Sequence, residues 1–195
     1  MISRFAHLLS LLVVLVAGGC AMSPDGPPPT QEQEISELAE EIRSFGPEVD
    51  PEEAQRAARI AFEYSHQLAR EYQVTDPPLI HNTKVNLGLR PRGLCYQWAD
   101  DLEARMRQED FRTLALHRAI ANSGNPLRID HSTLIVSRSG DGMFEGVVLD
   151  PWRNGGDLHW SPTLEDSHYR WRPRAEVFEE QLRRQRLRER QTAAG

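Results

Sequence analysis

One cysteine, one histidine and one aspartate stand out because their types and order suit nucleophilic catalysis. Cys95 follows a glycine and a leucine, His131 opens the run 131–136, and Asp150 closes the apolar run 147–149. A thiol attacks well only as the thiolate, which the positive end of a helix favours. A histidine can take and return the proton, while a carboxylate holds the imidazole in one tautomer. The sequence therefore predicts Cys95 as nucleophile, His131 as general base and acid, and Asp150 as the orienting residue.

The elements that must position these residues are predicted from the spacing of apolar side chains. Helical periodicity covers three segments, 34–45, 50–72 and 94–109. Short apolar runs bounded by Gly- and Asn-rich turns predict strands at 114–120, 131–136 and 146–149. The segment 140–142, Gly-Asp-Gly, is typical of a hairpin turn between the last two strands. The order predicts an α+β fold in which N-terminal helices and a central helix pack on an antiparallel sheet.

Two further segments are predicted to be loops. Residues 73–93 contain Pro77-Pro78 and several further breakers, and a connection of this length usually serves a site. Residues 151–173 contain three tryptophans and a tyrosine, whose large side chains are able to cover a neighbouring part of the domain. A charged helix is expected from Arg174 to Gln191.

The three stretches around these residues together resemble the transglutaminase-like superfamily of papain-type cysteine enzymes. In that family a G-x-C sequence opens the central helix, a histidine lies on one of the next strands, and an Asp-Pro ends the following strand. The match involves residues 92–98, 130–136 and 147–152, within a resemblance that covers about residues 80–155. It implies a transglutaminase-like or papain-like fold with Cys95, His131 and Asp150 in catalytic roles.

The chain also departs from that family at one position and leaves one role open. The family often has an aromatic residue two positions after its histidine, where this chain has Thr133. An oxyanion-hole donor is implied upstream of the cysteine. Asn82, Asn86 or a residue near Arg92 would serve, and nothing in the sequence selects among them.

The N-terminus indicates export and lipid attachment. Arg4 precedes the apolar run 5–16, which is too short for a transmembrane helix. Small residues then lead to Cys20, similar to the lipobox of bacterial lipoproteins, in which the cysteine is acylated and the chain is cleaved before it. We expect a signal peptide over 1–19 and a lipidated Cys20 with a Pro-rich tether over 20–33. Ala21, in place of an aspartate, favours the outer membrane by the same resemblance.

These assignments give a domain organisation and a location. A transglutaminase-like domain with a helical N-terminal part is expected over 34–175, followed by a charged C-terminal helix and tail over 176–195. The protein is expected in the bacterial cell envelope, on the outer membrane and facing the periplasm. The chain has two cysteines, so lipidation of Cys20 would leave Cys95 alone in an exported domain. A lone exported thiol is either buried and inert or chemically useful.

Composition argues against several other classes of protein. A net charge of −6 disfavours a nucleic-acid partner. No Gly-rich phosphate loop is present, and His159 and His168 with their acidic neighbours lack metal-ligand spacing. No nucleotide, metal or other cofactor is therefore expected. The expected partners are a membrane, through the lipid, and a peptide or cell-envelope substrate.

Three functional hypotheses follow. The first is a lipid-anchored cysteine hydrolase or acyltransferase that acts on peptide or amide bonds. The second is a non-catalytic envelope lipoprotein that uses the same fold as a binding or assembly module. The third is a structural lipoprotein whose helices contact partners, which predicts that Cys95, His131 and Asp150 do not converge in space.

Overall fold

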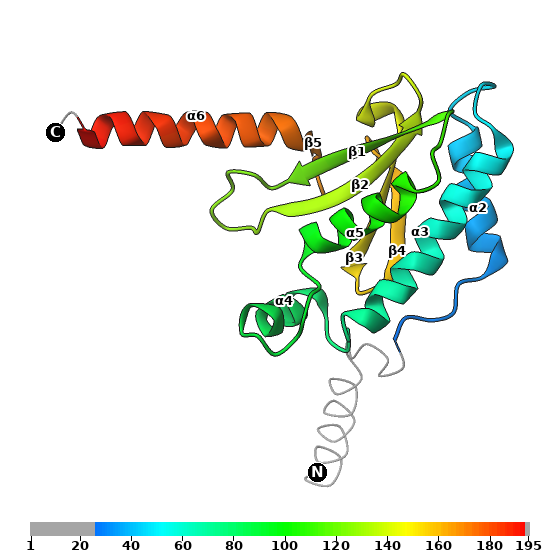
Figure 1. The fold of residues 1–195 in the computed structure, drawn as a ribbon, viewed down its shortest axis with the longest axis horizontal. Coiled ribbons are helices and arrows are strands. Elements are labelled where there is room, and N and C mark those ends of the chain that lie inside the picture. The colour runs from blue at the N-terminus through cyan, green and yellow to red at the C-terminus, as the bar shows by residue number, and fades with distance from the viewer. Residues whose placement is uncertain (1–25, 194–195) are drawn as a thin grey trace, which may run out of the picture.

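The computed structural model describes residues 26–193, which form helices packed against one sheet (Figure 1). The helices are α2 (Glu32–Arg43), α3 (Pro51–Glu71), α4 (Pro78–Asn86), α5 (Cys95–Arg107) and α6 (Arg174–Ala193). The strands are β1 (Leu114–Ala121), β2 (His131–Arg138), β3 (Val147–Asn154), β4 (Asp157–Pro162) and β5 (Arg172–Pro173). Neighbouring strands are antiparallel in the order β4-β3-β2-β1-β5. The predicted α+β fold class is therefore confirmed.

The predicted signal peptide, Cys20 and the first part of the tether lie outside the described residues. The rest of the tether leads directly into the folded domain, since Thr30 hydrogen-bonds the ring of His66 and α2 begins at Glu32. Within residues 26–193, no helix combines the length and the apolar composition that a membrane span requires.

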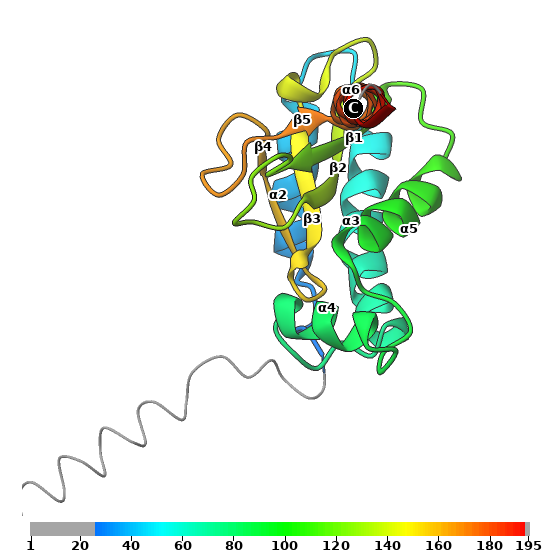
Figure 2. The same ribbon diagram turned by 90° about the vertical axis from the view of Figure 1, so that its left-hand side faces the viewer.

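Helices α2, α3 and α5 cover one face of the sheet (Figure 2). Helix α3 begins where the sequence predicts, because the Asp50 carboxylate accepts hydrogen bonds from two first-turn N–H groups and Pro51 needs no partner there. Its apolar stripe packs with α2, α5 and inward-facing strand residues such as Leu134 and Leu149, all in one buried cluster. This core fixes the position of the sheet relative to α5.

The other face of the sheet is covered by irregular structure. Ile135 of β2 and Val148 of β3 pack there with Met143 and Trp171. Because both faces are covered, β2 is buried at every position except its last. The centre of the sheet is therefore dry, and a polar side chain placed there needs partners within the protein.

Residues 73–93 do not form the continuous loop that the sequence analysis predicted. They contain helix α4, in which Pro78 occupies the first turn and Pro77 precedes it. Proline suits this position because its fixed φ is helical and its missing N–H would have no partner there. The Pro-Pro pair thus starts a helix.

The predicted loop over 151–173 is also only partly correct. Strand β3 continues past Pro151 to Asn154, and a turn at Gly155-Gly156 leads into β4. Pro151 is tolerated in this inner strand because the β3–β4 register shifts between Asp150 and Asn154. The β2–β3 connection is longer than a tight hairpin, since a 3₁₀ turn (Met143–Glu145) follows Gly142.

Helix α6 follows β5 directly and extends away from the sheet, as Figure 1 shows. Its single buried residue in the described part of the chain is Val177. Helix α6 begins at Arg174, as the sequence predicts, and only its first turns are close enough to the domain to shape a site.

Candidate active site

Cys95 is the first residue of α5, where the helix presents backbone N–H groups that no earlier turn can satisfy. Just before it, the N–H groups of Gly93 and Leu94 both donate to the side-chain oxygen of Gln97, at 2.9 and 3.0 Å. The indole N–H of Trp98 donates to the Gly93 carbonyl at 3.0 Å. Two side chains of the first turn of α5 therefore hold the segment that leads to the thiol.

Gly93 is required in this segment for two reasons. Its φ is +127°, which side-chain-bearing residues rarely adopt, and an added Cβ would lie 2.3 Å from Nε2 of His81. His81 is fully buried on α4, and its Nε2 donates to the Arg92 carbonyl at 2.8 Å. Helix α4 thus supports the backbone just before the thiol, in addition to Gln97.

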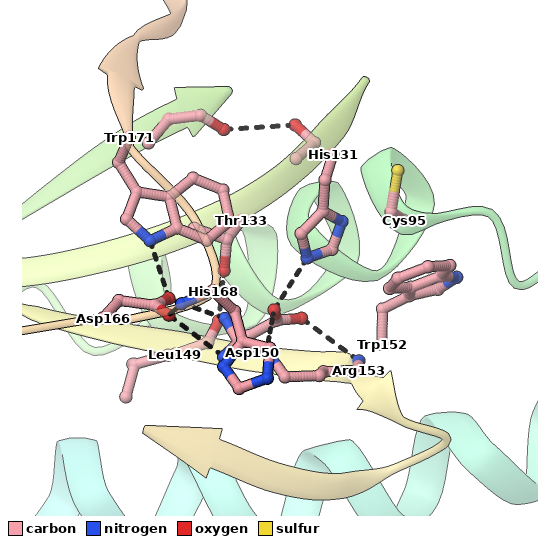
Figure 3. A network of polar contacts seen from close by, with 12 residues as sticks. Cys95, His131, Thr133, Leu149, Asp150, Trp152, Arg153, Asp166, His168 and Trp171 are labelled. Atoms are coloured by element: carbon pink, nitrogen blue, oxygen red, sulfur yellow. Dashed lines mark hydrogen bonds and ion pairs between the residues drawn. The ribbon is translucent and has the colours of Figure 1, made fainter. Parts of the chain in front are cut away.

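The side chain of His131, the first residue of β2, meets that of Asp150, in the middle of β3, just beyond the ladder that pairs Leu134 with Leu149. The Nε2–H of His131 donates to Oδ2 of Asp150 at 2.7 Å, and both side chains are almost completely buried (Figure 3). A carboxylate can only accept, so Nδ1 carries no proton in the neutral ring. This Nδ1 is buried without a hydrogen bond, on the side of the ring that faces Cys95 in Figure 3.

Asp150 has a second cationic partner in Arg153. Nε of Arg153 donates to Oδ2 of Asp150 at 3.0 Å, and the Arg153 backbone N–H donates to Oδ1 at 3.2 Å. The far end of the guanidinium donates to both oxygens of Asp166, at 3.2 and 2.6 Å. Asp166 also accepts from the Trp171 indole and the His168 backbone N–H. The result is a buried chain of alternating charges, His131–Asp150–Arg153–Asp166.

Three aromatic rings enclose the imidazole. The ring centroids of Trp152 and Tyr169 each lie 4.6 Å from that of His131, and the centroid of Trp171 lies 5.3 Å away. Tyr169 also lies against the guanidinium of Arg153, 4.7 Å from its ring centroid. The rings exclude water from His131 and strengthen its interaction with Asp150.

This environment shifts the protonation equilibria of the network. Burial disfavours a charged imidazole, but the Asp150 carboxylate and the contact with Cys95 outweigh it and raise the pKa of His131 to about 9. Burial would raise the pKa of Asp150, yet His131 and Arg153 hold it below its usual range. Burial acts the same way on Asp166, where hydrogen bonds from Arg153, His168 and Trp171 lower the pKa to about 2. The network therefore favours ionised carboxylates and a protonated imidazole.

The thiol of Cys95 is 8% exposed and lines a cavity of about 310 Å³. Its S–H donates to the Asp130 carbonyl, with the sulfur 3.6 Å from the oxygen. Across the cavity stand Arg174 and Phe178 from the first turns of α6, and the buried Arg118 lies at its side. A small acyl group can thus reach the thiol from this cavity.

The upstream residues predicted as oxyanion donors have different environments. Asn82 lies near the site, because its side-chain oxygen accepts from the indole N–H of Trp152 at 3.0 Å. The side chain of Arg92 turns away to the Asp101 carboxylate, and no contact in the described residues ties Asn86 to the site. The N–H groups of Cys95 and Tyr96, at the start of α5, remain as backbone donors close to the thiol.

The structure brings Cys95, His131 and Asp150 together, and it adds residues that sequence reasoning missed. Arg153 and Asp166 were not predicted as parts of the site, and His81 was placed in a loop. An arginine three residues after the predicted Asp150 was the one local signal available. Within residues 26–193, no group of three or more histidine, cysteine or acidic side chains is arranged to hold a metal ion.

Comparisons with known proteins identify no relative. No protein-family model, curated protein or solved structure matches this chain. The site must be interpreted from its own geometry.

Proposed function

We propose that this chain is a lipid-anchored envelope protein with a transglutaminase-like Cys-His-Asp domain, acting as a cysteine hydrolase or acyltransferase on peptide or amide bonds. The observation that carries the proposal is the orientation of the imidazole. Its Nε2–H is bound to the buried Asp150 at 2.7 Å, and its Nδ1, the nitrogen that takes the additional proton of the imidazolium, faces a thiol at a helix N-terminus (Figure 3). This arrangement suits transfer of the Cys95 proton to His131.

The chemistry then follows in two stages. A small rotation of the Cys95 side chain moves its S–H from the Asp130 carbonyl to Nδ1 of His131, and the proton passes to the imidazole before the attack. The thiolate, now beside an imidazolium, attacks the carbonyl carbon. The N–H groups of Cys95 and Tyr96 are placed to stabilise the oxyanion. The imidazolium protonates the leaving amine, which leaves a thioester on Cys95. Attack of water on the thioester completes a hydrolysis, and attack of a second amine completes an acyl transfer. In both reactions His131 acts as the base.

Reactivity of the thiol tests this proposal. We expect Cys95 to react with iodoacetamide near pH 7 at least tenfold faster than glutathione does, and His131→Ala to remove this advantage. A Cys95→Ala protein should take up no label, since Cys95 is the one cysteine of the described chain. A wild-type rate equal to that of glutathione would overturn the activated-nucleophile role. Amide hydrolysis and amine transfer can then be separated with a fluorogenic peptide amide, assayed with and without added amine.

The lipid anchor has its own test. The mature protein should partition into the detergent phase of a Triton X-114 separation, and Cys20→Ser should move it to the aqueous phase. Partition of both proteins into the aqueous phase would refute the anchor without touching the chemistry of Cys95.

One observation favours the non-catalytic alternative, a binding or assembly module of the same fold. The thiol is only 8% exposed, and it is hydrogen-bonded to a carbonyl and not to His131. This alternative predicts a Cys95 that stays unlabelled in the folded protein but reacts after unfolding in urea. The same labelling experiment therefore decides between the two functions.

A further inference from the structure

A second hollow lies beside the thiol cavity, between α4 and the loop that joins β1 to β2. Its volume is about 560 Å³, and its lining includes Leu79 on α4, Leu127 and Ile129 on the loop, and Trp152. We call this hollow the α4 groove. Figure 1 shows α4 and the β1–β2 loop projecting on the same side of the domain. Three of these apolar side chains, those of Leu79, Leu127 and Ile129, are exposed and do not belong to the core.

The α4 groove is directly connected to the catalytic residues. Its wall residue Trp152 packs against the His131 ring and belongs to the same buried cluster as Cys95. Consecutive residues Ile129 and Asp130 line the groove and the thiol cavity respectively. A ligand that crosses this segment therefore passes from the groove to the thiol.

The apolar surface of the groove is unusually exposed. Leu127 is 92% exposed and Leu79 is 61% exposed, and Ile129 beside them is half exposed. All three side chains line the same hollow, Leu79 from α4 and the other two from the β1–β2 loop. An arrangement of this kind fits an extended peptide with apolar side chains.

The charged residues that line the groove indicate the charge of the peptide that it would bind. Its charged lining residues are Arg128 and Arg153, and no carboxylate is among them. The guanidinium of Arg128 lies 5.6 Å from the ring centroid of Tyr169, and both residues line the groove. Arg153 is neutralised by Asp150 and Asp166, so Arg128 supplies the unpaired positive charge.

The positive surface continues beyond Tyr169. An adjoining hollow of about 730 Å³ shares Arg128 and Tyr169 with the groove and adds Arg170 and His168. Its one acidic lining residue, Asp166, is buried and bound to Arg153. Arg128 and Arg170 are exposed and form no ion pair within the described residues, although the net charge of the chain is −6. They favour a ligand with at least two negative charges along its length.

We propose that the α4 groove and the adjoining hollow bind an acidic peptide segment with alternating apolar side chains, which leads an amide bond to Cys95. The apolar side chains enter between Leu79 and Leu127, and the carboxylates meet Arg128 and Arg170. This proposal rests on the proposed function only where it places the amide bond at the thiol. The binding itself requires no chemistry.

The test measures binding to the full chain carrying Cys95→Ala, so that no turnover occurs. Two matched peptides, acetyl-Leu-Glu-Leu-Glu-amide and acetyl-Leu-Gln-Leu-Gln-amide, are titrated at low salt, with tryptophan fluorescence as the readout. We expect the acidic peptide to bind about tenfold more tightly. Arg128→Gln should abolish this preference while leaving affinity for the neutral peptide unchanged. Leu127→Ser should weaken both peptides by a similar factor.

Arg190→Gln is the matched control, since it removes the same charge at the far end of α6, outside both hollows. It should leave both affinities unchanged. Equal affinity for the two peptides, or a loss with Arg190→Gln as large as with Arg128→Gln, would overturn the proposal. A reactive Cys95 combined with equal peptide affinities would refute peptide selection by the groove and leave the proposed enzyme function intact. Selective binding of the acidic peptide combined with an inert Cys95 would refute the proposed enzyme function and leave peptide selection by the groove intact.

Discussion

The two halves of the candidate site are built by opposite means. On the sheet side, His131 is held by charges, because Asp150, Arg153 and Asp166 continue from it in one buried chain. On the helix side, Cys95 is placed by close packing and by hydrogen bonds to the backbone: the N–H groups of Gly93 and Leu94 bind the Gln97 side chain, and Gly93 packs against the His81 ring. The two sides meet only where the imidazole faces the thiol.

This difference predicts how each side responds to pH and to mutation. Charges in a dry site depend on protonation, so the sheet side should lose stability when either partner changes its charge. Backbone hydrogen bonds and close packing do not titrate between pH 5 and pH 10, so damage to the helix side should cost about the same at any pH in that range. Variants on each side can therefore separate the two contributions.

The largest effect is expected on the sheet side, from Asp150→Ala. The change leaves Arg153 and a charged His131 without their shared carboxylate in a buried site. We expect the free energy of unfolding at neutral pH to fall by about 3–5 kcal/mol, together with the loss of rapid Cys95 alkylation. Urea unfolding followed by circular dichroism measures the first quantity. A loss below about 1 kcal/mol would mean that the ion pairs of Asp150 contribute no more than ordinary surface ion pairs, which would contradict the buried charge network.

The next effect is the pH dependence that His131 contributes. Its pKa is about 9 in the folded protein against an ordinary value of 6.5, so its stabilising effect is complete below 6.5 and is lost as pH rises through 9. The stability difference between wild type and His131→Gln should therefore shrink by roughly 3 kcal/mol between about pH 6 and about pH 9.5. Urea titrations of both proteins at the two pH values measure it. A constant difference would mean that folding does not shift the pKa of the His131 imidazole.

The three residues proposed to react could be predicted from the sequence better than the residues that hold them in place. Cys95, His131 and Asp150 each carry a local signal: a G-x-C before helical periodicity, a residue at the start of an apolar strand, and an Asp-Pro after one. The elements expected around them, an α5 helix and strands β2 and β3, form at those places. Arg153 is marked only by its place three residues after Asp150, and Asp166 carries no local signal. Their contact depends on how the segment after β4 folds back over the sheet, which local patterns do not specify.

The missed elements have the same cause. Pro77-Pro78 was taken as a loop signal, although proline is equally suited to the first turn of α4. Pro151 was taken as the end of a strand, although the register shift in the β3–β4 pair lets the strand continue. In both places the residue permits two local structures, and packing against the rest of the domain selects one.

On the helix side, Gly93→Ala is expected to cost about 2 kcal/mol. The added Cβ must occupy positive φ and would lie 2.3 Å from Nε2 of His81, so the segment before Cys95 has to move. The loss should be equal at pH 6 and at pH 9.5, in contrast to the loss from His131→Gln. A second change, His81→Ala, removes the clash but not the backbone strain, and should restore only part of the stability. Full restoration would show that contact with His81, and not φ, is what requires glycine.

The smallest effect is expected from Gln97→Leu, which removes the acceptor for the N–H groups of Gly93 and Leu94. Loss of a helix-capping side chain costs about 1 kcal/mol, and the near-equal volume of leucine keeps the packing. The unpaired N–H groups will draw the segment towards water, so Cys95 alkylation should slow more than stability falls. Gln67→Leu, whose amide makes an exposed contact with Glu71 on α3, is the matched control and should change neither quantity. If Gln97→Leu is alkylated at the wild-type rate, the hydrogen bonds from Gln97 do not position Cys95. The helix side would then hold the thiol through packing alone.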